Sequence, residues 1–134
     1  MRVFFDTNVL ISGLMGHGLC HDLLDRCLIG HTVLLGAPVR EELRRVLVSK
    51  FLVPADMWDE LDLRLREFEQ APPATVPLNV SISDPDDAPI LACAVVAKAD
   101  AFVTGDKILL NLGKIEGMPI LSPRELWQQL TGAG

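Results

Sequence analysis

The 134-residue sequence has no CxxC pair and no long run of apolar residues. Its three cysteines are an odd number, and its three histidines form no zinc-ligand spacing with them, so we expect free thiols that pack as small apolar side chains. Charged residues interrupt every apolar stretch well before the ~20 residues that a membrane-spanning helix needs. The chain begins with a strand-like segment rather than a signal peptide, which makes a cytoplasmic protein the expectation.

The sequence also lacks an excess of positive charge, with 12 Lys and Arg against 18 Asp and Glu and a net charge of −6. This balance counts against a stoichiometric nucleic-acid-binding protein, because phosphate contacts usually provide most of the affinity. It counts less against an enzyme, because metal ions neutralise clustered carboxylates and positive side chains can gather on one face. Arg40, Arg44 and Arg45, with Lys50 beyond them, form such a local cluster.

Short apolar segments alternate with amphipathic ones along the whole chain, and the length suits a single domain over residues 1–134. The expected strands are Arg2–Phe5, Thr32–Leu35, Val76–Ile82, Ala101–Thr104 and Ile120–Leu121. The expected helices are Cys20–Leu28, Pro38–Ser49, Ala55–Glu69, Asp84–Lys98 and a last helix capped by Ser122-Pro123-Arg124-Glu125. This alternation predicts an α/β fold with a mostly parallel sheet and helices on both faces. Such sheets place their functional residues at the carboxyl ends of the strands.

Four acidic residues lie where strands or amphipathic helices meet loops: Asp6, Glu42, Asp87 and Asp106. Each has an ordinary explanation alone, since aspartate favours turns and helix starts. Carboxylates are costly to desolvate singly, but together they suit hard divalent cations such as Mg²⁺ or Mn²⁺. A doubly wound fold would bring all four to one rim, which is what metal-assisted phosphodiester hydrolysis needs.

Helical geometry selects among neighbouring acids. Glu42 lies at the edge of the apolar face of its helix, whereas Glu41 points away. Asp87 precedes Ile90 and Leu91 by three and four residues and so shares their inward stripe, which favours it over Asp86. Asp84 or Asp86 is expected to cap the helix, and Asp84 stays a candidate for the site if the turn folds back.

At these motifs the chain resembles the PIN-domain (PilT N-terminus) family, and specifically the VapC-like ribonuclease toxins of toxin–antitoxin systems. The resemblance covers nearly the whole chain and rests on the opening Met1-Arg-Val-Phe-Phe-Asp-Thr-Asn, on Arg40-Glu-Glu-Leu, on Asp84-Pro-Asp-Asp-Ala and on Thr104-Gly-Asp-Lys. Even the tail Pro119-Ile-Leu-Ser-Pro-Arg-Glu-Leu is typical. One departure is Ile108, where relatives often carry an acid.

The resemblance implies a three-layer α/β/α sandwich around a five-stranded, mostly parallel sheet. It also implies a Mg²⁺- or Mn²⁺-dependent endoribonuclease, with one or two ions, that cleaves single-stranded RNA. A homodimer and inhibition by a cognate antitoxin protein are implied as well.

By the same resemblance, the ligands of the metal are Asp6, Glu42, Asp87 and Asp106. Asn8 and Thr104 are expected to orient ligands or the attacking water. Arg40 or Arg44, beside Glu42, is a candidate for contact with the RNA backbone.

Three other functions are compatible with acids at strand ends. A phospho-acceptor signalling domain would need paired acids early in the chain and a lysine after its last strand, and a haloacid-type phosphatase would need Asp-x-Asp at the first strand. The sequence has neither, since Asp6 is followed by Thr7-Asn8. A PIN fold kept as an RNA- or protein-binding module with little turnover is the stronger alternative, although all four acids are present.

Overall fold

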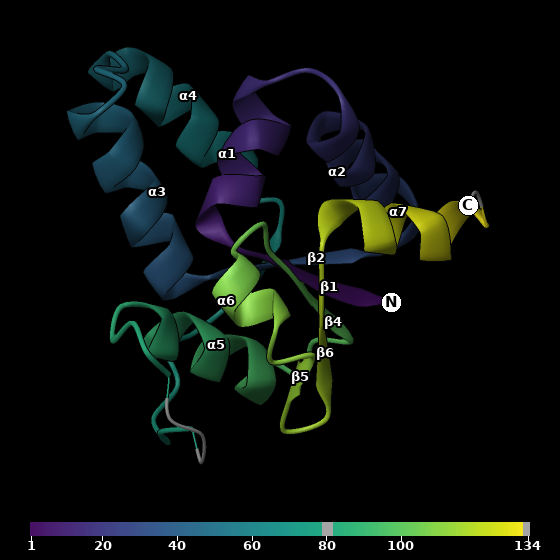
Figure 1. Ribbon diagram of the computed structural model, residues 1–134. Coiled ribbons are helices and arrows are strands. Elements are labelled where there is room, and N and C mark those ends of the chain that lie inside the picture. Colours follow the sequence, from purple (N-terminus) through teal and green to yellow (C-terminus); the bar gives the residue numbers. More distant parts are fainter. Residues whose placement is uncertain (79–81, 133–134) are drawn as a thin grey trace.

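The computed structural model describes residues 1–78 and 82–132 and contains one mixed sheet with helices around it (Figure 1). The strands are β1 (Arg2–Phe5), β2 (Thr32–Gly36), β3 (Glu69–Ala71), β4 (Ala101–Val103), β5 (Lys114–Ile115) and β6 (Met118–Leu121). The helices are α1 (Thr7–Met15), α2 (Leu19–Gly30), α3 (Ala37–Ser49), α4 (Ala55–Leu65), α5 (Asp87–Val96), α6 (Lys107–Leu110) and α7 (Pro123–Thr131). None of the helices in this part of the chain is long and apolar enough to cross a membrane.

The sheet has the order β3-β2-β1-β4-β6-β5, and every pairing is parallel except β5 with β6. Strand β1 is central, because it pairs with β2 on one side and with β4 on the other. Figure 1 shows α1 and α2 on one side of this sheet and α5 on the other. The predicted α/β fold with a mostly parallel sheet between two helical layers is therefore confirmed.

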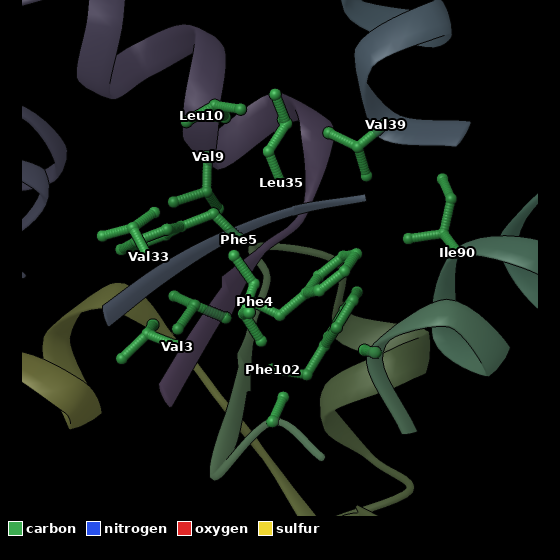
Figure 2. Close-up of a cluster of buried hydrophobic side chains, with 14 of the residues drawn as sticks. Val3, Phe4, Phe5, Val9, Leu10, Val33, Leu35, Val39, Ile90 and Phe102 are labelled. Atoms are coloured by element: carbon green, nitrogen blue, oxygen red, sulfur yellow. The ribbon is translucent and has the colours of Figure 1, made fainter. Parts of the chain in front are cut away.

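Alternating side chains of β1 build the core on both faces of the sheet. Phe4 stacks on Phe102 of β4 with ring centroids 5.6 Å apart. Figure 2 shows this pair on the side of Ile90, whereas Phe5 lies on the side of Val9. All of these side chains are buried, so the ends of β1 and β4 are fixed by packing on both faces.

The edge of the sheet differs from the sequence prediction, because the described residues form six strands instead of five. The helix expected over Ala55–Glu69 ends at Leu65, and the chain then pairs with β2 as strand β3. The side chain of Gln70 stabilises this break by donating hydrogen bonds to the carbonyl oxygens of Leu65 at 2.9 Å and Phe68 at 2.7 Å. The expected strand Val76–Ile82 includes residues 79–81, which lie outside the described part of the chain, and its other residues are in no strand.

The predicted start of the last helix is confirmed, whereas the start of α5 differs from the prediction. The side chain of Ser122 accepts a hydrogen bond from the amide of Glu125 at 3.1 Å, and the Glu125 carboxylate accepts one from the Ser122 amide at 3.0 Å. The helix expected over Asp84–Lys98 begins later, at Asp87. Asp86 stands at its N-cap position without a capping side-chain bond. The carboxylate of Asp84 instead accepts from the Asp86 amide at 2.9 Å, which closes the turn before the helix.

Candidate active site

Asp6 stands between the end of β1 and the start of α1, where it is the N-cap residue. One carboxylate oxygen, Oδ1, accepts a hydrogen bond from the Thr7 amide at 2.8 Å, and Oδ2 accepts one from the Thr104 hydroxyl at 2.7 Å. Burial raises the pKa of Asp6, and the charge of Asp106 adds to this rise, whereas the bonds from Thr104 and Thr7 lower the pKa. The two donors hold the carboxylate in one orientation at the end of the sheet.

Thr104 connects Asp6 to Asp106. Its side chain is fully buried directly after β4, and its hydroxyl oxygen also accepts a hydrogen bond from the Asp106 amide at 3.1 Å. Asp106 is exposed and caps α6, because its Oδ1 accepts from the Ile108 amide at 2.9 Å. The carboxyl ends of two neighbouring parallel strands thus present two carboxylates that share one threonine.

Asp87 is the first residue of α5 and is partly buried. Burial, together with the negative charges of four carboxylates, raises its pKa from 3.8 to about 6; in order of decreasing effect these are Asp6, Asp84, Asp106 and Glu42. A charge affects a partly exposed carboxyl group only when it is near. The fold therefore brings acids from four separate segments to the same edge of the sheet. We call this set the acidic rim: Asp6, Glu42, Asp84, Asp87 and Asp106.

Glu42 reaches this rim from α3, on the second turn of the helix. Its side chain is 27% exposed, and Oε2 lies 4.0 Å from Nη2 of Arg45. Glu41, its neighbour, is exposed, which agrees with the predicted difference between the two residues. Glu42 has the weakest of the four effects on Asp87.

A cleft of about 270 Å³ opens between the loop before α5 and the start of α6. Asp84, Asp87 and Asp106 line it, so the turn that holds Asp84 does fold back to the other acids. Ile108, which is 62% exposed and departs from the family resemblance, also lines this cleft. The side chain of Asn8, on the first turn of α1, is exposed and forms no hydrogen bond with the described residues.

The carboxylate oxygens of this rim are ligands that suit a hard divalent cation, but the carboxylates lie too far apart to surround one closely. Among residues 1–78 and 82–132, no group of three or more His, Cys, Asp or Glu side chains could hold a metal ion by itself. Carboxylate oxygens are the ligands that Mg²⁺ and Mn²⁺ prefer, and Mg²⁺ usually keeps several of its waters. An ion held partly through its waters needs fewer direct protein ligands, so the residues present fit such an ion.

The comparison with family sequences identifies the fold family. A sequence model described as "PIN domain" matches residues 2–108, a segment that contains all four predicted metal ligands. The chain belongs to the PIN-domain family. PIN domains are generally nucleases, and these nucleases generally use divalent metal ions. No curated protein sequence matches the chain significantly.

A solved structure agrees with this family at the level of the fold. A chain from the crystal structure of VapBC2 from Rickettsia felis, bound to a DNA fragment from their promoter, aligns with a TM-score of 0.66 and 16% identity. The alignment covers 91% of this PIN domain and 98% of that chain. The PIN domain endonuclease Utp24 aligns with a TM-score of 0.49 and 21% identity over 90% of this chain and 84% of its own. The second TM-score is too low to support a conclusion.

Sequence reasoning missed one feature of this rim. The sequence suggested Arg40 or Arg44 beside Glu42, whereas the guanidinium that lies 4.0 Å from the Glu42 carboxylate belongs to Arg45. The spacing of three residues on one helix is the signal that could have predicted this neighbour. The hydrogen bond from the Thr7 amide to Asp6 agrees with the capping role that aspartate commonly has at a helix start.

Proposed function

We propose that this PIN domain is a Mg²⁺- or Mn²⁺-dependent endoribonuclease that cleaves single-stranded RNA in the cytoplasm. The observation that carries the proposal is the placement of the acids: Asp87 and Asp106 line one cleft, and Thr104 joins the Asp6 carboxylate to the Asp106 backbone. Acids gathered in this way repel one another, which costs folding free energy in the absence of a cation. A divalent ion relieves that repulsion, so the arrangement favours metal binding over a purely structural role.

In this proposal Asp6, Glu42, Asp87 and Asp106 would hold the ion or ions, and Asp84 lines the cleft beside Asp87 and Asp106. When bound, the ion would supply a nucleophilic water and stabilise charge on the phosphate. Thr104 positions the Asp6 carboxylate through its 2.7 Å hydrogen bond and ties it to the Asp106 backbone. The exposed side chain of Asn8, on the first turn of α1, is available to orient water.

Cleavage of a mixed-sequence single-stranded RNA by the purified chain tests the proposal. Cutting should require Mg²⁺ or Mn²⁺, stop in EDTA and be lost in Asp6→Asn. This variant keeps the size of the side chain and an oxygen that accepts the Thr7 or Thr104 hydrogen bond, so the fold should survive. Asp59→Asn is the matched control, because Asp59 is an exposed aspartate on α4 that lines none of the clefts beside the acids. Cutting that persists in Asp6→Asn contradicts the assignment of the site.

A catalytically weak binding module is the second candidate, and the open spacing of the carboxylates favours it. In that case the chain binds RNA or a protein without cutting, and Mn²⁺ changes the affinity only slightly. Binding of RNA by the wild type, with no cleavage in either metal, would select this alternative.

We propose further that the chain is the toxin of a toxin–antitoxin pair and forms a homodimer. The likeness of its fold to a chain of the VapBC2 structure supports this proposal, as do the exposed apolar side chains at the junction of α3 and α4. Phe51, Leu52 and Met57 are 62%, 78% and 50% exposed there, and protein partners commonly cover such side chains. Sedimentation over a range of concentrations tests the dimer. Isolation of the tagged chain from its native cells, with identification of the proteins that co-purify, tests the antitoxin.

A further inference from the structure

A second cleft, of about 300 Å³, lies on the other side of Glu42 between α3 and the start of α5. Glu42 and Arg45 line it from α3, and Asp86 and Pro89 line it from the other wall. Arg45 is the only basic residue among the residues that line this cleft, which also include Glu41. A cation thus stands at the border of the acidic rim, where the proposed substrate must place its phosphates.

The basic residues of α3 differ in what they contact. Arg40 donates two hydrogen bonds, at 2.9 and 2.6 Å, to one oxygen of Asp62 on α4, whose side chain is only 13% exposed. This pair holds Arg40 between α3 and α4. Arg44 is exposed and is not among the residues that line either cleft beside the acids.

Arg45 is held only weakly. Its side chain is 70% exposed, and the one ion pair that it forms with the described residues, to Glu42, has a long N···O distance of 4.0 Å. Exposed pairs of this kind contribute little to stability. A guanidinium presents a planar fork of N–H donors that matches two oxygens of a phosphate, so Arg45 is available for a phosphate contact.

We infer that Arg45 binds a phosphate of the RNA strand next to the phosphodiester that is cleaved, and so forms a substrate subsite in the α3–α5 cleft. The inference rests on the proposed nuclease function. Pro38, Glu41 and Pro89 also line a neighbouring, larger cavity of about 510 Å³, so the subsite is continuous with a second open space beside α3. Arg45 replaces Arg40 and Arg44, the positions that the sequence suggested.

Steady-state cleavage of single-stranded RNA by wild type, Arg45→Ala and Arg45→Lys tests the inference. A lost phosphate contact should raise KM about tenfold in Arg45→Ala and change kcat less than about twofold, because the contact is the same before and during the reaction. Arg45→Lys should recover part of the loss, since it keeps the charge but not the fork.

Binding of the same RNA in Ca²⁺, measured across a series of NaCl concentrations, gives a readout that a purely structural arginine would not change. The slope of log affinity against log salt should fall by about 0.7 in Arg45→Ala, the value for one phosphate on a single strand. Arg64→Ala is the matched control: Arg64 is exposed on α4 and forms no ion pair with the described residues. Arg44→Ala tests the competing position on the same helix.

The inference is overturned if Arg45→Ala leaves both KM and the salt slope as they are in Arg64→Ala, or if Arg44→Ala has the larger effect. It is also overturned if Arg45→Ala lowers the melting temperature without changing KM, since Arg45 would then only support the helix. In these cases the wild type still cleaves RNA and the proposed function stands. Failure of the wild type to cleave or bind RNA removes the function and the inference together.

Discussion

Removal of one negative charge from the acidic rim, that of Asp87, should make the metal-free protein more stable. Asp87 has a pKa of about 6 in the folded protein against 3.8 for an ordinary aspartate. Because the folded pKa is raised, the shift stabilises the fold below pH 3.8, and that stabilisation is lost as the pH rises through 6. At pH 7 the folded state therefore has the full cost of the buried, repelled charge.

The size of this cost follows from the shift. A difference of about 2.2 pKa units corresponds to about 3 kcal/mol at 1.36 kcal/mol per unit, if no solvent screens the charge. The carboxyl group is only partly buried and stands at a helix N-terminus, where negative charge is favoured, so the net cost is about 1 kcal/mol. Asp87→Asn should therefore raise the free energy of unfolding by about 1 kcal/mol at pH 7. For a chain of this length, that corresponds to a melting temperature higher by roughly 3–5 °C.

Urea unfolding in EDTA at pH 7 and pH 4 measures this effect as the difference between variant and wild type. The difference should be largest at pH 7 and close to zero at pH 4, where the wild-type carboxyl group is protonated. Asp86→Asn is the control, because Asp86 is exposed at the same helix start and makes no capping side-chain bond. A variant Asp87→Asn that is no more stable than the wild type at pH 7, or equally stabilised at both pH values, would refute the electrostatic reasoning.

Three further substitutions test single contacts. Thr104→Val removes the hydroxyl between Asp6 and Asp106. This variant should lower kcat for RNA about 10- to 100-fold and lower stability by about 1–2 kcal/mol. An unchanged kcat would contradict the proposal that Thr104 positions the Asp6 carboxylate. Gly36→Ala should destabilise the fold by about 1–3 kcal/mol in thermal unfolding, because the new Cβ would lie 2.6 Å from Cζ of Phe4. In the control Gly30→Ala the new Cβ meets nothing within 4 Å, so this variant should change stability by less than about 1 kcal/mol. Ser122→Ala removes the capping box of α7 and should lower stability by about 1 kcal/mol without changing RNA cleavage; reduced cleavage would show that α7 affects the site.

The sequence predicted the interior of the fold better than its edges. Val3, Phe4 and Phe5 form a continuous apolar run, and a central strand buried on both faces requires such a run. Strand β3 has no such signal, because Glu69 and Gln70 are exposed and only Ala71 is buried. The pairing of β3 with β2 depends on where α4 ends. The hydrogen bonds of Gln70, which form only in the folded chain, help to fix that end.

The candidate site shows the same division. The sequence places Asp6 and Asp106 at the ends of strands, and parallel pairing of β1 with β4 then brings them together. The position of Asp84 in the cleft depends on the conformation of a turn, which aspartate and proline favour but do not specify. The choice between Arg40 and Arg45 depends on Asp62, which lies 22 positions from Arg40 on another helix. Helical spacing alone cannot reveal such a partner.

The central claim is that a divalent ion on the acidic rim enables RNA cleavage. Its most direct test measures Mn²⁺ occupancy by electron paramagnetic resonance and the cleavage rate in the same samples, for wild type, Asp6→Asn and Asp59→Asn. We predict that the cleavage rate rises in proportion to Mn²⁺ occupancy in the wild type and in Asp59→Asn. Asp6→Asn should lose both Mn²⁺ binding and cleavage. Cleavage in EDTA, or cleavage by Asp6→Asn without bound Mn²⁺, would contradict the claim.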